Sequence, residues 1–520
     1  MLVLHSGVLH RGPVPVHATK GVELPKPYGH SGDGLRCLRC LPAVMALGAF
    51  GRKKRRPQAK YFTNKNSCGK NQSKMTIRAI SGSEWLAGEQ DDREFDSKEA
   101  YLKSLADQDA LPIGFQLGSS SLKFVPEEAQ EMGELPMKLT VICLDEATDK
   151  VAAVFTQNAF PGAPVKLGRR RMEEGQKIQA IVVNNKISNV SPPDADGGVS
   201  ASETICSELA NNLKLSSENA VLPSSTGVIG WRLPVKEMIA ALPTAKDLSD
   251  KGALEAAEGI MTTDRYPKLC SRKLSNGRLV GIAKGAGMIE PNMATMLCFL
   301  MTDVDIPREE LQEMLSEIAV DSFNAISVDG DESTSDTVIL LSSGKAGKIS
   351  KDEFKSALRE LCCDLSAQIV RNGEGTQHVI RVTVTGAESD ATARRVGKAV
   401  VNGPLFKSAI AGNDPNVGRL IGKVGQTLGA SGAAMAEGCT CKIGGETIFE
   451  NGQFRLDTEK ERRLSGHLKF AAANCELPYP EHRRVVDVEV ILGGGGSGSA
   501  VVLGSDLTTE YVKINADYRS

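Results

Sequence analysis

Residues 284–299 read Lys-Gly-Ala-Gly-Met-Ile-Glu-Pro-Asn-Met-Ala-Thr-Met-Leu-Cys-Phe. The two glycines predict a turn, and the apolar run that begins at Met296 predicts a buried strand. Thr295 stands where the turn enters the strand, and the small residue Ala294 before it leaves its carbonyl accessible. This arrangement suits a chain that cuts itself, because the Thr295 hydroxyl can attack the Ala294 carbonyl and free Thr295 as a new N-terminus.

An N-terminal threonine carries a nucleophile and a base in one residue. Its hydroxyl attacks, and its own α-amine, whose pKa in model peptides is about 7.7–8.0, takes the proton. The spacing also fits an ordinary threonine in a loop that enters a core strand. The residues by themselves therefore leave both interpretations open.

The charges of the 520-residue chain are unevenly spread. Residues 1–75 hold 14 Lys and Arg against 2 Asp and Glu, so this head carries a net charge of +12 and the remainder −14. A basic head on an acidic body favours a targeting leader over a nucleic-acid surface. The longest apolar stretch in the head, residues 41–50, is too short to span a bilayer. We expect a targeting leader and linker over residues 1–110, and neither a nucleic-acid nor a membrane partner.

Cysteines and histidines do not form a catalytic or metal-binding pattern. The 12 cysteines are scattered, and the lone Cys37-Leu-Arg-Cys40 in the head has no second pair at zinc spacing. Four of the seven histidines also lie in the head, which leaves His378, His467 and His482 in the body. We expect free thiols in a reducing compartment, no metal, and a nucleophile that brings its own base.

Alternating and helical periods predict regular structure from about residue 111 onward. Strands are expected at 137–144, 151–156, 178–183, 379–386 and 500–503, and helices at 201–213, 307–323 and 351–370. We interpret residues 145–150 as the turn of a hairpin between the first two strands, and the glycine-rich residues 493–498 as a tight hairpin turn. Ser200 or Ser202 is the expected N-cap of the first helix.

Thr226-Gly227, within Leu222-Pro-Ser-Ser-Thr-Gly-Val-Ile-Gly230, is a second candidate for chemistry. In such a turn a hydroxyl and a backbone N–H can point at one spot. That donor pair is what the oxyanion of a tetrahedral intermediate needs. A plain Ser/Thr/Gly turn explains the same residues, so the pattern alone leaves the role open.

The segment around Thr295 resembles the cleavage segment of the ornithine acetyltransferase (ArgJ) family, the glutamate N-acetyltransferases of arginine biosynthesis. The family cuts itself at Ala-Thr within Lys-Gly-Ser/Ala-Gly-Met-Ile-x-Pro-Asn-Met-Ala-Thr-Met-Leu. Further motifs match in family order at residues 155–165, 225–230, 261–268, 329–337, 373–376, 405–419 and 506–520. The match covers roughly Leu135 to Ser520, and the chain is identified as a divergent, eukaryotic-type member with an N-terminal leader.

The resemblance implies roles for individual residues. Thr295 would be the nucleophile, with cleavage between Ala294 and Thr295, and Thr226 with Gly227 would form the oxyanion hole. The implied substrate-binding residues are Thr262, with Thr263 as the near alternative, Lys284, Thr295, Glu374, Asn515 and Ser520.

The implied fold is α/β, with packed β-sheets flanked by helices (DmpA/ArgJ-like) and the chain cut in two. Residues 111–294 would form an α chain and residues 295–520 a β chain of one catalytic unit, assembled as two α and two β chains. The implied reaction moves acetyl from N2-acetyl-L-ornithine to L-glutamate through an acetyl-threonine. No bound cofactor is implied, acetyl-CoA stays open as a co-substrate, and the leader indicates a mitochondrial matrix or chloroplast stroma.

The resemblance breaks after the strand that ends at Val183. There the family has Asn-Ser-Gly-Asn-Ala-Asn-Ala-Cys-Thr-Gly, whereas this chain has Asn184-Asn-Lys-Ile-Ser-Asn-Val-Ser191. Glu332, Ser335 and Val417 also replace family residues. These replacements allow the substrate pocket of this chain to differ from that of the family. Two alternatives stay open: an N-terminal-nucleophile amidohydrolase or aminopeptidase, in which water replaces glutamate, and a self-cleaved non-catalytic paralogue.

Overall fold

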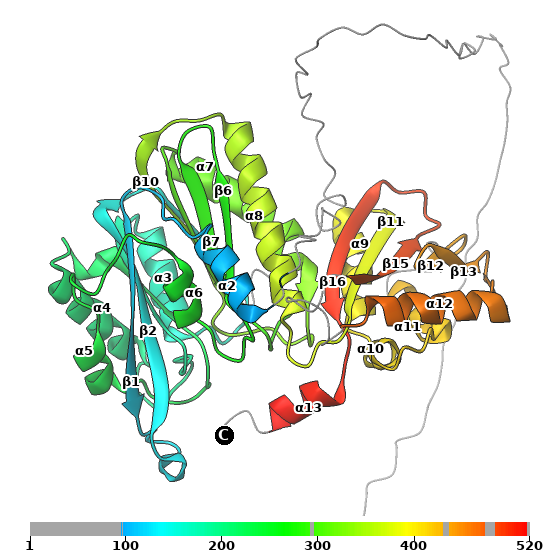
Figure 1. The fold of residues 1–520 in the computed structure, drawn as a ribbon, viewed down its shortest axis with the longest axis horizontal. Coiled ribbons are helices and arrows are strands. Elements are labelled where there is room, and N and C mark those ends of the chain that lie inside the picture. The colour runs from blue at the N-terminus through cyan, green and yellow to red at the C-terminus, as the bar shows by residue number, and fades with distance from the viewer. Residues whose placement is uncertain (1–94, 96, 292–295, 430–435, 474–483, 517–520) are drawn as a thin grey trace, which may run out of the picture. The chain divides into compact units, whose positions relative to one another are not determined.

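The computed structural model describes residues 95, 97–291, 296–429, 436–473 and 484–516. The density of contacts divides the chain into residues 1–76 and residues 77–520, and every described residue belongs to the second of these units. The described strands form three sheets (Figure 1). No helix in this part of the chain has both the length and the apolar character that a membrane crossing needs.

Two of the sheets pack face to face around a shared core. The first has the strand order β1-β2-β4-β5, and the second has the order β3-β10-β8-β7-β6. In these orders the strands are Phe115–Phe124, Leu135–Thr148, Ile178–Asn184 and Val221–Ser225, then Val151–Phe155, Thr337–Gly347, Leu297–Val304, Arg278–Lys284 and Lys268–Lys273. Side chains alternate between the two faces of a strand. Leu297, Phe299 and Met301 of β8 therefore join the core between the sheets, while Cys298 and Leu300 join the core on the other side.

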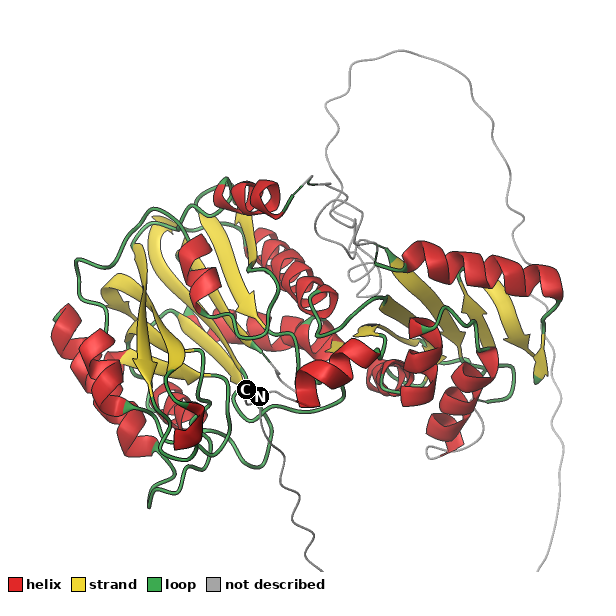
Figure 2. Ribbon diagram, turned by 60° about the horizontal axis from the view of Figure 1, so that its bottom comes forward, coloured by secondary structure: helices red, strands yellow, loops and turns green. Residues whose placement is uncertain are grey.

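Helices cover the outer faces of both sheets (Figure 2). On the second sheet, α7 (Arg308–Asp321) and α8 (Lys351–Arg371) bury apolar side chains at helical spacing. On the first sheet lie α3 (Ala163–Glu173), α4 (Val199–Leu213) and α5 (Val235–Ala241). The layers run helix, sheet, sheet, helix, which confirms the predicted α/β class with packed sheets between helices.

The third sheet has the order β14-β13-β12-β15-β11-β16-β9. In this order its strands are Gln453–Phe454, Glu446–Glu450, Thr440–Ile443, Val485–Ile491, Val379–Ala387, Gly498–Ser505 and Ile326–Ser327. Its own core also includes side chains of α9 (Asp390–Val401), α10 (Pro404–Ala411), α11 (Val417–Gly429) and α12 (Thr458–Ala471). The other helices are α2 (Lys98–Ala106), α6 (Leu254–Gly259), α13 (Thr509–Ala516) and three 3-10 turns at Gln130–Met132, Glu218–Ala220 and Phe323–Ala325.

The strands and helices expected from the sequence are confirmed, but both expected hairpins are wrong. Strand β2 pairs with β1 and β4, whereas β3 pairs with β10 in the other sheet. Where the chain passes from β2 to β3, Thr148 Oγ1 donates a 2.8 Å hydrogen bond to the Ser342 carbonyl of β10. This bond links the two sheets. Strand β11 lies between β15 and β16, so residues 493–498 pass the end of β11 instead of closing a hairpin.

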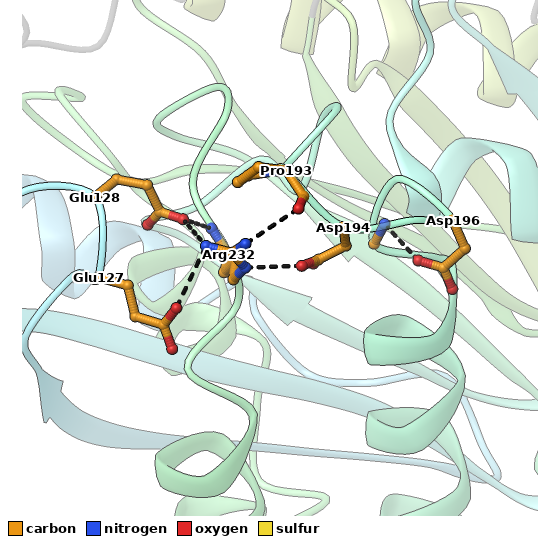
Figure 3. Close-up of polar contacts among 7 residues, drawn as sticks. Glu127, Glu128, Pro193, Asp194, Asp196 and Arg232 are labelled. Carbon is orange, nitrogen blue, oxygen red and sulfur yellow. Dashed lines mark hydrogen bonds and ion pairs between the residues drawn. The ribbon is translucent and has the colours of Figure 1, made fainter.

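The predicted serine caps of α4 are also wrong. Ser200 and Ser202 lie inside the helix, and Gly198 is the N-cap residue, with a φ of 88°. The Asp196 carboxylate accepts hydrogen bonds from the N–H groups of Gly198 at 3.0 Å and Ser200 at 2.7 Å. Figure 3 shows Asp196 in the loop before the helix. An acidic side chain satisfies the free N–H groups of a first helical turn as a serine would, and its negative charge suits the helix dipole.

Candidate active site

A cavity of about 270 Å³ lies among loop residues that follow β4 and β5, strand residues of β7 and β8, other loops and the C-terminal helix α13. It brings together Thr226, Gly227, Lys284, Glu374 and Asn515, which the sequence analysis had selected from separate motifs. These residues span almost 300 positions of the chain, so only the folded structure makes them neighbours.

For the other predicted site residues, the structure leaves a choice open or does not describe the residue. Thr262 and Thr263 both line the cavity, so both retain access to a ligand. Ala294, Thr295 and Ser520 lie outside the described residues. The two residues that follow Thr295 in the sequence, Met296 and Leu297, line the cavity.

The Thr226-Gly227 turn is shaped to present hydrogen-bond donors. The Thr226 N–H donates a 3.1 Å hydrogen bond to the Asn184 carbonyl at the end of β4. Gly227 has a φ of 118°, and a Cβ there would overlap the Lys186 carbonyl, so only glycine fits. Among the described residues, no acceptor is found for the Gly227 N–H.

Lys284, at the end of β7, orients the other donor. Its Nζ donates a 2.8 Å hydrogen bond to Thr226 Oγ1. Because that oxygen accepts from the ammonium, the Thr226 O–H hydrogen is left to donate elsewhere. Thr226 and Gly227 thus offer two donors side by side in a cavity wall, the arrangement that an oxyanion requires.

The Lys284 ammonium also keeps capacity for a ligand. Lys284 is 8% exposed, and this burial lowers its pKa, while the negative charges of Asp264, Asp336 and Glu374 oppose the shift. An ammonium has three N–H donors, and Thr226 takes one of them. The remaining donors suit a carboxylate.

Asp264 and Lys268 form a buried ion pair behind Lys284, and both side chains are fully inaccessible to solvent. The Asp264 carboxylate also accepts from the N–H groups of Gly285 at 2.8 Å and Thr262 at 2.9 Å. Burial acts to raise the pKa of Asp264, but Lys268 and Lys284 lower it to about 2. Both residues lie in the family motif at residues 261–268, but nothing in the sequence assigned them a role. Their four-residue spacing was a visible signal, but their burial was not.

A carboxylate and an amide stand on another part of the cavity wall. Asn515 Nδ2 donates a 2.7 Å hydrogen bond to Glu374 Oε2, and Glu374 is 6% exposed. The Glu374 N–H donates to the Ala286 carbonyl at 2.9 Å, and a Cβ at Gly287 would overlap the Glu374 carboxylate. A buried ammonium and a buried carboxylate in one cavity complement a ligand that carries both charges.

The segment that departs from the family pattern lies directly against the Thr226-Gly227 turn. The Val228 N–H donates to the Lys186 carbonyl at 2.9 Å, and the Ser188 N–H donates to the Val228 carbonyl at 3.0 Å. Asn184 Nδ2 donates to Ser225 Oγ at 2.7 Å. The altered segment therefore still supports the turn, and it adds the Ser188 side chain to the cavity wall.

Arg232 fixes the loop that follows this segment (Figure 3). Its guanidinium donates to Asp194 at 2.7 Å, to Glu128 at 3.1 Å and to the Pro193 carbonyl at 3.1 Å. An arginine that is bonded on several sides has little freedom to move. The loop before α4 is thus tied to the residues just beyond the Thr226-Gly227 turn.

Sequence reasoning missed a wall of hydroxyl groups. Ser333, Thr334 and Ser335 line the cavity beside Asp336. Within the described structure, Thr334 Oγ1 and Ser335 Oγ are buried without a hydrogen-bond partner. Buried hydroxyls without partners are unusual and indicate a position that a ligand can satisfy. Ser335 had been noted only as a replacement of a family residue.

The described residues that line the cavity include neither histidine nor cysteine. His378 is buried elsewhere, with its Nδ1 2.8 Å from Asp506. In the described part of the chain, no group of three or more His, Cys, Asp or Glu side chains is arranged to hold a metal. Among the described residues, a nucleophile in this cavity therefore finds no imidazole to serve as its base.

Comparison with known proteins assigns the chain to a family. Residues 130–520 match the model described as the ArgJ family. This chain belongs to the ArgJ family.

Among its relatives, "Arginine biosynthesis bifunctional protein ArgJ" of Bifidobacterium longum (strain NCC 2705) is 36% identical over 389 residues, 74% of this chain and 93% of the relative. "Arginine biosynthesis bifunctional protein ArgJ 2" of Nostoc sp. (strain PCC 7120) is 38% identical over 367 residues, 70% of this chain and 89% of the relative.

Solved structures similar to this ArgJ-family chain include the arginine biosynthesis bifunctional protein ArgJ of Bacillus halodurans. It is 35% identical, with a TM-score of 0.37, covering 42% of this chain and 97% of that one. The ornithine acetyltransferase of Mycobacterium tuberculosis, complexed with ornithine, is 24% identical, with a TM-score of 0.28, covering 36% of this chain and 96% of that one.

Replacing Asp264 by asparagine is expected to lower the free energy of unfolding by about 3–5 kcal/mol, because Lys268 is left buried without a counter-charge. The folded-state pKa of Asp264, about 2, lies below its ordinary value of 3.8. The stability that its ionisation contributes is therefore fully present above about pH 4 and is lost as the pH falls toward 2. Urea unfolding at neutral and acid pH measures both effects.

Glu313→Gln is the control, because Glu313 forms an exposed ion pair with Lys351 at 3.1 Å. We expect that variant to keep the unfolding midpoint of the unaltered protein. An Asp264→Asn protein as stable as the control at neutral pH would contradict the assigned role of the buried pair.

Proposed function

We propose that this chain is an acyltransferase that moves acetyl from N2-acetyl-L-ornithine to L-glutamate in arginine biosynthesis. The observation that carries the proposal is the cavity in which Thr226, Gly227, Lys284, Glu374 and Asn515 meet. Membership of the ArgJ family supports the same reaction. The nucleophile would be Thr295, freed by self-cleavage after Ala294.

In the first half of the reaction, the Thr295 hydroxyl attacks the acetamide carbonyl and its α-amine takes the hydroxyl proton. The carbonyl oxygen becomes an oxyanion, which the Thr226 O–H and the Gly227 N–H stabilise. The C–N bond then breaks, and the leaving amine of ornithine receives the proton from the Thr295 ammonium. Acetyl-Thr295 remains as an ester.

In the second half, the amine of glutamate attacks the ester carbonyl, and the same two donors stabilise the second oxyanion. The Thr295 α-amine takes a proton from the attacking nitrogen and gives it to the Thr295 oxygen as the C–O bond of the ester breaks and N-acetylglutamate leaves. Glutamate and ornithine share an α-amino-acid frame, so one set of groups serves both. Lys284 binds the α-carboxylate in this proposal, while Thr262, Glu374, Asn515 and Ser520 hold the rest of the ligand.

The hydroxyl wall supports an exchange between these two substrates. The side chain of ornithine ends in an ammonium and that of glutamate in a carboxylate. A hydroxyl accepts a hydrogen bond from the first and donates one to the second, so it tolerates both where a fixed charge would reject one. The chain needs no bound cofactor for this exchange, and acetyl-CoA is a candidate second acetyl donor.

The unaltered chain is expected to yield two fragments, with the C-terminal one beginning Thr-Met-Leu-Cys-Phe. N-acetylornithine alone should add the mass of one acetyl group to that fragment, because the ester forms before glutamate is needed. Thr295→Ala should lose both cleavage and transfer. Intact-mass measurement of each fragment, with and without N-acetylornithine, checks these outcomes.

Thr295→Ser is the control for this experiment, since serine keeps the hydroxyl and should retain part of both activities. A single full-length band from purified, active protein would overturn the cleavage. Fragments that release acetate but never form N-acetylglutamate would favour a hydrolase, and fragments that never acquire acetyl would favour a non-catalytic paralogue.

Thr226→Ala is expected to lower kcat by roughly 10²–10³-fold, the usual loss for one oxyanion donor. Thr226→Ser keeps the hydroxyl that accepts from Lys284 and should retain most of the rate. Steady-state kinetics of the two variants at saturating substrates makes the comparison. Equal rates for Thr226→Ala and the unaltered enzyme would remove Thr226 from the oxyanion hole.

We further propose that the basic head addresses the protein to the mitochondrial matrix or the chloroplast stroma, and that the mature enzyme contains two α and two β chains. The charge of residues 1–75 supports the first statement, and the family resemblance supports the second. A fluorescent fusion of residues 1–110 should enter one of these compartments and lose that address when the basic residues are neutralised. Uniform cytosolic fluorescence would contradict it.

A further inference from the structure

Residues 286–291, which precede the proposed cut, are bonded mainly to residues that follow it. Most of the described partners of this segment lie between positions 327 and 402. Gly287 and Met288 of the segment line the cavity. Once the chain is cut, a wall of the active site is therefore the end of one chain held by another.

Asp329 makes the first attachment. Its carboxylate accepts hydrogen bonds from the N–H groups of Met288 at 2.7 Å and Ile289 at 2.8 Å. Met288 has a φ of 55°, a left-handed conformation that a non-glycine residue adopts only where its surroundings hold it. The Tyr511 hydroxyl donates to the same carboxylate at 3.2 Å, so Asp329 also ties down the helix that carries Asn515.

Glu290 makes the second attachment. Its carboxylate lies 3.2 Å from Lys398 Nζ and accepts a 3.0 Å hydrogen bond from Asn402 Nδ2. The Glu290 and Lys398 side chains are only 18% and 13% exposed, so water screens this pair weakly. Asn402 is held in turn through Ser327, whose Oγ donates to its Oδ1 at 2.6 Å.

Backbone contacts complete the attachment. The Val328 N–H donates to the Ile289 carbonyl at 2.7 Å, and the Glu374 N–H donates to the Ala286 carbonyl at 2.9 Å. Ile289 is fully buried. Glu374 thus takes its position in the cavity from the segment itself, since its carboxylate rests against Gly287.

We propose that Asp329 and the Glu290–Lys398–Asn402 contact are positioning residues that keep residues 286–291 in the cavity wall after the chain has been cut. This inference rests on the proposed cleavage between Ala294 and Thr295. A covalent chain keeps this segment in place from both ends. In a cut chain the downstream end of this segment is free, so these side chains, together with the backbone contacts of Ala286 and Ile289, must keep Gly287 and the carboxylate of Glu374 in place.

Glu290→Gln tests the proposal, because it keeps the size of the side chain and removes its charge. We expect complete cleavage, a fall in kcat/KM for N-acetylornithine of roughly 10- to 100-fold, mostly through KM, and kcat within about twofold. Hydrogen exchange at the Met288 and Ile289 amides should be faster than in the unaltered cleaved enzyme. In the uncleaved Thr295→Ala background, the same substitution should change that exchange little.

Glu317→Gln is the matched control, because Glu317 pairs with Lys355 at 2.6 Å between two helices of the downstream chain. It should leave KM and exchange unchanged. Asp329→Asn provides a second variant with the same expectation as Glu290→Gln. Unchanged KM and exchange in cleaved Glu290→Gln and Asp329→Asn enzymes would overturn the inference while leaving the proposed function standing. Active unaltered protein that stays in one piece would overturn both.

Discussion

The Asp264 carboxylate is paired with the buried Lys268 ammonium and is also stabilised by the charge of the buried Lys284, and the arrangement of the cavity depends on it. Removing ions from water costs several kcal/mol each, so a buried pair is weak as a source of stability. The buried pair contributes here by fixing the positions of the groups around it. Asp264 receives the backbone N–H groups of Gly285 and Thr262 and the ammonium of Lys268. One side chain thus fixes the end of β7, the start of β6 and the loop between α6 and β6, and Lys284 is aimed at Thr226 as a result.

The rest of the cavity explains why a nucleophile that supplies its own base suits this fold. Hydroxyls and amides line much of it, and the described lining residues include no imidazole. Lys284 is committed to Thr226, and Glu374 is committed to Asn515. The Glu374 carboxylate, one of the described groups in the cavity that could accept a proton, is thus already held by a partner. A base carried on the same residue as the nucleophile avoids competition with these contacts.

Short motifs located much of this cavity from the sequence, because each motif encodes its own local geometry. A glycine at 227 is required by a backbone conformation that other residues avoid, and glycine at 287 by the nearby Glu374 carboxylate. Strand pairing was another matter. An alternating pattern predicts which side chains face the core, but it does not predict which strand will be the hydrogen-bonded neighbour. Both hairpins failed because another pairing partner was available: β10 for β3, and β11 for β15 and β16.

The attachments of residues 286–291 were hidden from the sequence for a related reason. Glu290 and Lys398 are 108 positions apart, and neither belongs to a pattern that marks the other. Self-cleavage adds a constraint that an uncut fold does not face. A loop that is covalently attached at both ends tolerates weak contacts because the attachments limit its motion. A free chain end lacks one of these attachments, so it gains more conformational entropy when it leaves its site. The side chains that hold such an end must therefore come from the other fragment and act within a few residues of the cut. Asp329, Lys398 and Asn402 meet that requirement, so under the proposed cleavage the contacts that complete the cavity of the cut chain are already made in the uncut chain.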